Sequence, residues 1–139
     1  MLDRAIGSAT RTTVLLGHSC GSVAVAHWAA QYDRRVAGAV LVAPSDVERA
    51  NVAPAVAAFG PMPLGVLPFP TLLIASEDDP CCAPERARMF ARAWGSELVF
   101  VGRAGHLNTA SGHGAWPEGK ELVRRFCSTL GMSCTKRLG

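Results

Sequence analysis

The sequence predicts an α/β fold built on a mostly parallel sheet. Four short segments are apolar throughout and rich in β-branched residues, as strands buried on both faces are: residues 13–16, 39–43, 71–75 and 98–101. Helical patterns alternate with these segments, and strands that alternate with helices form parallel sheets. The composition agrees, because 49% of the 139 residues are hydrophobic and only 18% are charged, which excludes a disordered chain.

The first half of the chain predicts a strand, a tight turn, a helix and a second strand. The first strand ends at Gly17, and small and apolar residues recur at helical spacing from Cys20 to Tyr32. The second strand, residues 39–43, is stopped by Pro44. Residues 45–48 then suit the cap of a short helical turn.

The second half continues this alternation after a proline-rich connection. The third strand, residues 71–75, is followed by a helix from Pro84 to Trp94, which Gly95 closes. The fourth strand, residues 98–101, leads to a final helix over residues 117–130, where apolar residues again have helical spacing. Because parallel strands end at the same edge of a sheet, we expect the reactive groups at that edge.

Size and charge narrow the class of protein. A chain of this length buries one core, so we expect a single domain over residues 1–139, with its core at about 10–130 and a tail at 131–139. The 14 basic and 11 acidic residues leave a formal charge of +3, which is too small and scattered for a nucleic-acid partner. Residues 51–76 are uncharged but contain five prolines, which argues against a membrane span.

The cysteines and the amino-terminal residues predict the cellular compartment, and the basic residues indicate the kind of gene. The five cysteines are an odd set without a CxxC pair, which argues against a disulfide framework or a structural zinc site. Residues 1–17 lack the apolar region of a secretory signal. We therefore expect a cytoplasmic protein with no metal and no other cofactor. Twelve of the 14 basic residues are Arg, which suggests a GC-rich bacterial gene.

The turn after the first strand has the pattern of a nucleophile elbow. Residues 17–21 read GHSCG, a G-x-S-x-G sequence between a strand and a helix. The turn strains the backbone of Ser19, and glycine on either side, at 17 and 21, lets strand and helix approach closely. The Ser19 hydroxyl is then exposed above the sheet, and the N–H of Cys20 points at the position of an oxyanion.

Two later strand ends supply the partners that a serine nucleophile needs. Asp79 lies in the segment 76–80 after the third strand, and His106 follows the fourth. The order Ser, Asp, His is that of an α/β-hydrolase triad. His106 would take the proton of Ser19, and a carboxylate would hold the imidazole tautomer. Ser19, Asp79 and His106 are therefore the candidate catalytic residues.

Alternatives remain open for the acid and the base. Asp78 is a substitute for Asp79, and the pair before a proline also suits a simple turn. His113 is a second candidate for the base. His18 and His27 are interpreted as packing or surface residues rather than metal ligands.

Other residues near these motifs have both a functional and a structural interpretation. Cys81 and Cys82 are either a redox-sensitive pair or incidental loop residues. Trp116 either walls the site or belongs to the core. The uncharged residues 52–69 either line an acyl pocket or form a stiff loop packed on the sheet.

A series of short motifs resembles a known family. The motifs are GHSCG at 17–21, LVAPSDVE at 41–48, PFP at 68–70, ASEDDP at 75–80, WG at 94–95, AGH at 104–106, ASG at 110–112 and WPEG at 116–119. Over about residues 10–130 the chain resembles the small serine hydrolases of the retinoblastoma-binding-protein and bacterial YdeN type. The resemblance implies a three-layer α/β-hydrolase fold without a large cap, a Ser19–Asp79–His106 triad and esterase-like activity. Cys20 stands where the bacterial members usually have Leu.

The amino end departs from this family. Members begin with a strand and a Pro-Gly loop that supplies a second oxyanion donor, whereas only 13 residues precede Val14 here. Loss of one such donor costs about 3 kcal/mol of transition-state stabilisation. We expect a sheet of about four strands with the first at an open edge, which favours pairing with another chain. The expectation is either a piece of a longer protein or a homodimer formed through that edge.

Two classes of function follow. The first is a serine hydrolase that acts on small esters through an acyl-enzyme at Ser19, or transfers the acyl group to an acceptor other than water. The second is a catalytically silent interaction protein that keeps the fold and binds a partner at the open edge. Neither hypothesis requires a nucleic acid or a membrane as partner.

Overall fold

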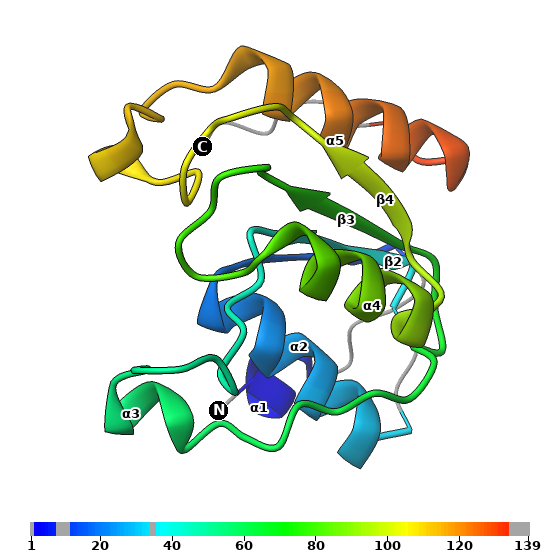
Figure 1. Cartoon of the computed structure of the whole chain (residues 1–139). Coiled ribbons are helices and arrows are strands. Elements are labelled where there is room, and N and C mark those ends of the chain that lie inside the picture. The colour runs from blue at the N-terminus through cyan, green and yellow to red at the C-terminus, as the bar shows by residue number, and fades with distance from the viewer. Residues whose placement is uncertain (1, 8–11, 34–35, 134–139) are drawn as a thin grey trace.

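The computed structural model describes residues 2–7, 12–33 and 36–133, so most of the expected tail lies outside the described residues. Within them the chain forms one parallel sheet in the order β1-β2-β3-β4 (Figure 1). The strands are β1 (Val14–His18), β2 (Gly38–Val42), β3 (Thr71–Ala75) and β4 (Glu97–Phe100). The predicted α/β class and the four strands are confirmed.

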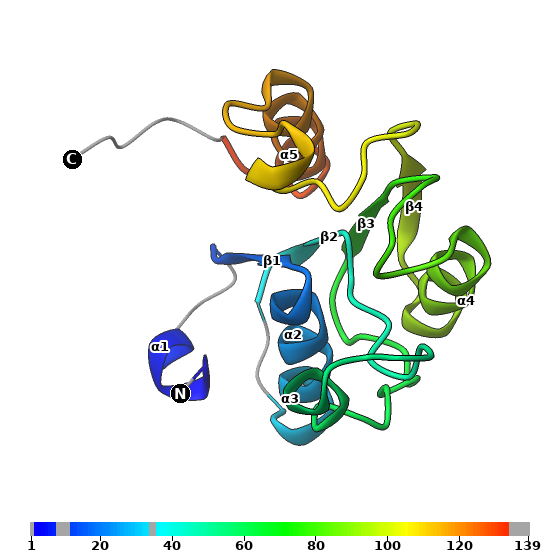
Figure 2. The ribbon, with the colours of Figure 1, turned by 60° about the vertical axis from the view of Figure 1, so that its left-hand side comes forward.

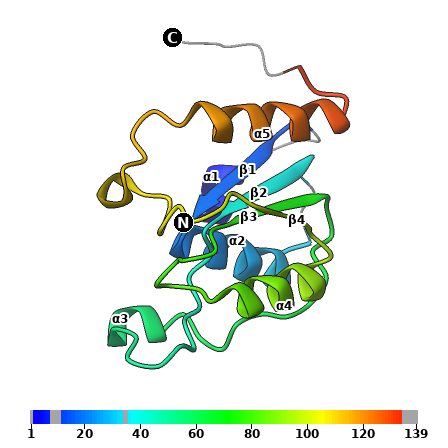
Figure 3. The same ribbon diagram turned by 45° about the horizontal axis from the view of Figure 1, so that its top comes forward.

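Helices cover both faces of this sheet. The helices are α1 (Leu2–Ile6), α2 (Cys20–Gln31), α3 (Pro54–Ala57), α4 (Pro84–Trp94) and α5 (Pro117–Thr129), with a 3-10 turn, η1 (Thr109–Ser111). Figures 2 and 3 show α2 and α4 on one side of the sheet and α5 on the other, which makes the expected three layers. Gly95 ends α4 in the left-handed conformation, with φ 67°, as its position predicted.

The sequence did not predict α1, α3 or η1. Each has five residues or fewer, which is too short for a periodic pattern or for stability in isolation. Tertiary contacts hold α1 instead: Ile6 is buried, and the Trp28 indole N–H donates to the Asp3 carboxylate over 3.3 Å. The short helical turn that residues 45–48 were expected to cap does not form; residues 47 and 48 lie in a non-helical turn.

The two central strands form the middle of the core. In the register, Val40 lies beside Leu72 and Leu41 beside Leu73. All five residues of β2 and of β3 are buried, because alternate side chains pack beneath α2 and α4 or beneath α5. A Cβ on Gly38 would lie within 3.0 Å of Leu130 and Phe126 atoms, so α5 approaches β2 closely there.

Strand β1 is an edge strand among the described residues, where it pairs with β2 alone. The side chain of Leu16, at its centre, is on the α5 side and 66% of the residue is exposed. The expected open edge is thus found within this part of the chain. None of the helices described combines the length and the apolar character needed to cross a bilayer.

Candidate active site

Ser19 lies at the turn between β1 and α2 in a strained conformation. Its φ is 56° and its ψ is −122°, a combination that costs a residue with a side chain about 1–3 kcal/mol. Its N–H donates to the Val42 carbonyl over 3.0 Å, which ties the turn to the carboxyl end of β2. The strain predicted for a nucleophile elbow is therefore present at this serine.

The two glycines of the motif are not equivalent. A Cβ on Gly17 would lie 2.8 Å from backbone atoms of Gly21 and Ser22, so only glycine fits there. A Cβ on Gly21 would meet nothing within 4 Å, and the expectation that both glycines permit the close approach is wrong for Gly21. The buried Ser22 hydroxyl also contacts the Gly17 and Val42 carbonyls, at 3.0 and 3.2 Å, and the motif gave no sign of this role.

The structure brings the three predicted residues together. His106 Nε2 lies 2.8 Å from Ser19 Oγ, and His106 Nδ1 lies 2.9 and 3.0 Å from the two Asp79 carboxylate oxygens. A carboxylate can only accept, so Nδ1 carries the proton and Nε2 accepts from the serine hydroxyl. The Asp79 side chain is 2% exposed and that of His106 is 14% exposed, so both lie largely out of water.

The neighbouring Asp78 binds the main chain before His106, whereas the His106 ring is hydrogen-bonded to Asp79. Its Oδ1 accepts from the Gly105 N–H over 2.8 Å and from the Ser76 hydroxyl over 2.9 Å. The hydrogen bond from Gly105, followed by that from Ser76, lowers the pKa of Asp78. Ser76 Oγ also accepts from the Ala104 N–H over 2.9 Å. Asp78 and Ser76 therefore clamp the loop that follows β4 and carries His106 (the histidine loop), a role that the sequence did not predict.

The other histidines have different partners. The His113 N–H donates to the Asn108 carbonyl over 3.0 Å, and its ring lies 3.3 Å from Ser111 Oγ. His27 Nε2 donates to the Phe59 carbonyl over 2.6 Å. His18 Nε2 donates to the main-chain carbonyl of His106 over 2.9 Å, so it links the end of β1 to the histidine loop.

The N–H of Cys20 is the first of α2, where helix N–H groups have no intrahelical acceptor. This is the position expected of an oxyanion donor.

Cys81 contacts the site through its backbone, because its N–H donates to Asp79 Oδ1 over 2.8 Å. Burial raises the pKa of the Cys82 thiol to about 12, which disfavours a reactive thiolate there.

An ion-pair network lies next to the turn that carries Asp79. Arg86 binds the buried Asp46 carboxylate through Nε at 2.7 Å and Nη2 at 3.0 Å, and Glu48 through Nη2 at 2.7 Å. Hydrogen bonds to these two carboxylates raise the pKa of Arg86. The Asp46 N–H donates to the Cys81 carbonyl over 2.9 Å. Residues 45–48, expected to cap a helix, thus connect the loops after β2 and β3.

A groove of about 760 Å³ runs between β1 and α5 beside the histidine loop. It is lined by Leu16, His18, Val42, Leu107, His113, Gly114, Trp116, Gly119, Lys120, Val123 and Arg124. Trp116 packs against the backbone at Gly119, where a Cβ would lie 2.0 Å from the ring. Trp116 lines this groove and is also half-buried against the core on the α5 side, so both roles considered for it are found.

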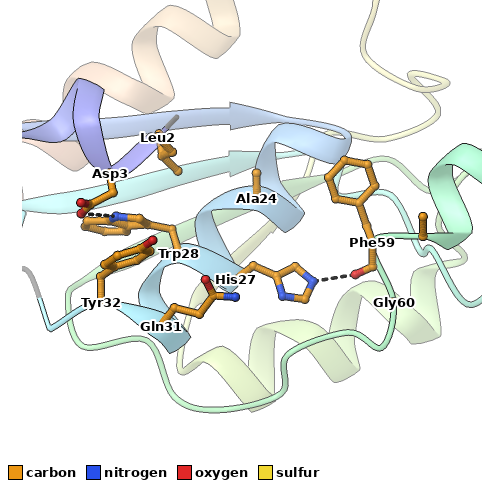
Figure 4. Close-up of a pocket in the computed structure, with 10 residues that line it drawn as sticks. Leu2, Asp3, Ala24, His27, Trp28, Gln31, Tyr32, Phe59 and Gly60 are labelled. Atoms are coloured by element: carbon orange, nitrogen blue, oxygen red, sulfur yellow. Dashed lines mark hydrogen bonds between the residues drawn. The ribbon is translucent and has the colours of Figure 1, made fainter.

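The uncharged residues 52–69 contribute little to this groove. Met62, Leu67 and Phe69 are buried in the core beneath α2 and α4, as expected of a loop packed on the sheet. Phe59 instead lines a smaller pocket of about 360 Å³, together with His27 and residues of α1 (Figure 4).

Three side chains from the loops after β3 and β4 could hold a metal ion. Among the described residues, Asp79, Cys81 and His106 offer ligand atoms that all lie within 4.8 Å of one another. Two of them are the acid and base of the candidate triad. No sequence spacing signals this set, because His106 comes from the loop after the next strand.

A parallel sheet in three layers, with a strained serine at the first strand end and a histidine against it, defines an α/β hydrolase. The serine hydrolase family model matches residues 1–125, and the chain belongs to this family. The match reaches further toward the amino end than the expected residues 10–130. The comparison with curated protein sequences gives no match.

Solved structures agree with this assignment. A YdeN-like hydrolase from Pectobacterium atrosepticum is 36% identical, with a TM-score of 0.78 over 93% of this chain and 66% of that one. The ydeN product of Bacillus subtilis is 20% identical, with a TM-score of 0.71 over 91% and 72%. Esterase 2 of Thermogutta terrifontis is 21% identical, with a TM-score of 0.63 over 88% and 55%. At these identities the last two similarities concern the fold alone. The chain spans between about half and three quarters of the length of the three proteins.

Proposed function

We propose that the chain hydrolyses small carboxylic esters through an acyl-enzyme on Ser19. The observation that carries the proposal is the continuous contact from Ser19 Oγ to His106 Nε2 and from His106 Nδ1 to Asp79. His106 takes the hydroxyl proton as Ser19 Oγ attacks the ester carbonyl, and Asp79 stabilises the imidazolium. The Cys20 N–H stabilises the oxyanion. His106 then protonates the leaving alcohol, and water attacks the acyl-enzyme by the same route.

The site suits an ester with an apolar acyl group. The groove beside His106 has aliphatic and aromatic lining from Leu107, Trp116 and Val123. Both classes of product, acid or transferred ester, follow from the same acyl-enzyme. Competing alcohols added to the assay would distinguish hydrolysis from acyl transfer by their products.

A fluorophosphonate probe tests the nucleophile directly. Esterase 2 of Thermogutta terrifontis is phosphorylated by paraoxon, which makes a phosphorus electrophile a suitable choice. We expect labelling of the wild type and loss of labelling in Ser19→Ala. Ser128→Ala is the matched control, because Ser128 is an exposed serine on α5 whose hydroxyl donates to the Arg124 carbonyl of the same helix over 3.0 Å. Equal labelling of wild type and Ser19→Ala, or of neither, would refute the proposal.

A second function is favoured by the open edge of β1. This strand contains neither proline nor a charged Asp, Glu, Lys or Arg, the features that usually protect an edge, and it exposes Leu16. A second copy of the chain pairing along β1 would bury Leu16 in both copies. We expect Leu16→Lys to shift the sedimentation coefficient toward that of a monomer. A wild type that stays monomeric at high concentration would refute this function.

The expected compartment is also a proposal. Cys20, Cys81 and Cys82 are free thiols in the described part of the chain. Free thiols are typical of the reducing cytoplasm, which supports a cytoplasmic protein.

A further inference from the structure

The turn after β3 places a thiol beside the candidate acid and base. Asp79 accepts from the N–H of Cys81 over 2.8 Å, which closes a tight turn through Pro80 and brings the Cys81 side chain back toward the carboxylate. Ligand atoms of Asp79, Cys81 and His106 all lie within 4.8 Å of one another. Cys81 is only partly buried, so a small ion can reach this group from solvent.

We propose that Asp79, Cys81 and His106 form an inhibitory site for Zn²⁺. The inhibitory consequence rests on the proposed hydrolase function, whereas the metal binding does not. Thiolate, imidazole and carboxylate are the three ligand types that Zn²⁺ takes in proteins, and three protein ligands leave a fourth position open. Tetrahedral zinc bonds of about 2.0 to 2.3 Å hold ligand atoms about 3.5 Å apart, so from separations of up to 4.8 Å the group must close by at most about 1.3 Å. Rotation of the partly exposed Cys81 side chain supplies this movement.

The inhibition follows from the tautomer of His106. Nδ1 faces Asp79 at 2.9 Å, and it is the ring nitrogen that the ion would occupy. The Cys81 thiol releases its proton to water as the thiolate binds the metal. The Nδ1 proton moves to Nε2, so one proton is released for each ion and nothing is oxidised or reduced. A protonated Nε2 donates instead of accepting, and His106 can no longer take the proton of Ser19.

Cobalt substitution tests the binding without any need for catalysis. We titrate the purified, reduced protein with Co²⁺ and record the near-ultraviolet charge-transfer absorption of a cobalt–thiolate bond. The wild type should develop this absorption, and Cys81→Ser should lose it. Cys82→Ala is the matched control, because the adjacent Cys82 sulfur contacts the Ala83 carbonyl and lies outside the ligand group. Circular dichroism shows that each variant is folded before titration.

Zinc inhibition is measured in parallel, with each variant compared with its own zinc-free rate. The zinc concentration for half inhibition should rise by at least about tenfold in Cys81→Ser, since even loss of outer partners of a metal ligand costs 10–100-fold. No thiolate absorption in the wild type, or equal absorption in folded Cys81→Ser, would overturn the metal site. A Cys81-dependent absorption in a protein without esterase activity would refute the proposed function and leave the metal site standing.

Discussion

The two glycines of the elbow give a matched test of how β1 and α2 are joined. A Cβ at Gly17 would lie 2.8 Å from three backbone atoms of Gly21 and Ser22, which is 0.6 Å short of the 3.4 Å where ordinary contact begins. Backbone atoms cannot rotate away, so Gly17→Ala forces β1 and α2 apart. Overpacking of this kind costs about 1–3 kcal/mol. At about 3 °C per kcal/mol for a chain of this size, the melting temperature should fall by about 3–9 °C.

Gly21→Ala should instead increase the free energy of unfolding. Its Cβ meets nothing within 4 Å, and alanine is the better residue in the first turn of a helix. We expect a gain of about 0.4–1 kcal/mol, chiefly from the lower entropy of the unfolded chain. Urea unfolding of both variants and of the wild type measures the difference. The reasoning is refuted if Gly17→Ala is as stable as the wild type, or if Gly21→Ala is the more destabilised of the two.

The displacement that Gly17→Ala causes should also lower the rate of ester hydrolysis. Ser19 follows two residues after Gly17, so moving the end of β1 moves Oγ relative to His106 Nε2. A misplacement of 1 Å costs about 100-fold in rate, so a shift of 0.6 Å should cost about tenfold. Ester turnover by folded Gly17→Ala, set against that of Gly21→Ala, measures this loss.

Three further predictions concern strain, charge and thiol burial. Ser19→Gly should lose fluorophosphonate labelling but gain about 1–3 kcal/mol in urea unfolding, because glycine tolerates φ 56°, whereas Ser19→Ala keeps the strain and should not gain. The pKa of Asp78 in the folded protein lies below the ordinary value of 3.8. The ionised carboxylate therefore stabilises the fold above pH 3.8, and this stabilisation is lost as the pH falls through the folded pKa. Asp78→Asn should weaken the dependence of the melting temperature on pH in this acid range. Native-state alkylation at neutral pH, read by mass spectrometry, should leave Cys82 unmodified, because burial raises the pKa of its thiol to about 12.

Each of these has a clear contrary result. Equal stability of Ser19→Gly and Ser19→Ala would show that the backbone at this residue is unstrained. An unchanged acid profile in Asp78→Asn would show that the carboxylate does not hold Gly105. Alkylation of Cys82 as fast as in the unfolded chain would show that its burial is not maintained.

Much of the fold follows from hydrophobic pattern alone. β2 and β3 are buried on both faces, so their residues are apolar throughout and their bounds were predicted to within one residue. α4 was predicted with its bounds, because charged and apolar residues separate on its two sides and Pro84 and Gly95 mark its ends. α1 and α3 had no such pattern, and they form because other parts of the chain pack against them.

The residues of the candidate site could be predicted from the sequence only in part. The elbow motif and the order of strand ends predicted Ser19, Asp79 and His106, which the structure places in contact. The choice between Asp78 and Asp79 could not be made from two adjacent residues of the same type. It depends on backbone direction, which turns one carboxylate toward the His106 ring and the other toward the Gly105 N–H. The groove beside α5 was also beyond prediction, because it is formed by residues that come from both ends of the chain.

Two separately held parts of the molecule meet at the candidate site. The elbow is fixed by Gly17 and by the buried Ser22 hydroxyl, whereas the histidine loop is clamped by Asp78. Two hydrogen bonds join the parts: Ser19 Oγ to His106 Nε2, and His18 Nε2 to the His106 carbonyl. The second bond fixes the main chain of the histidine, so the first does not have to position the ring by itself. The serine–histidine contact can therefore break and re-form, as proton transfer requires, while the loop stays in place.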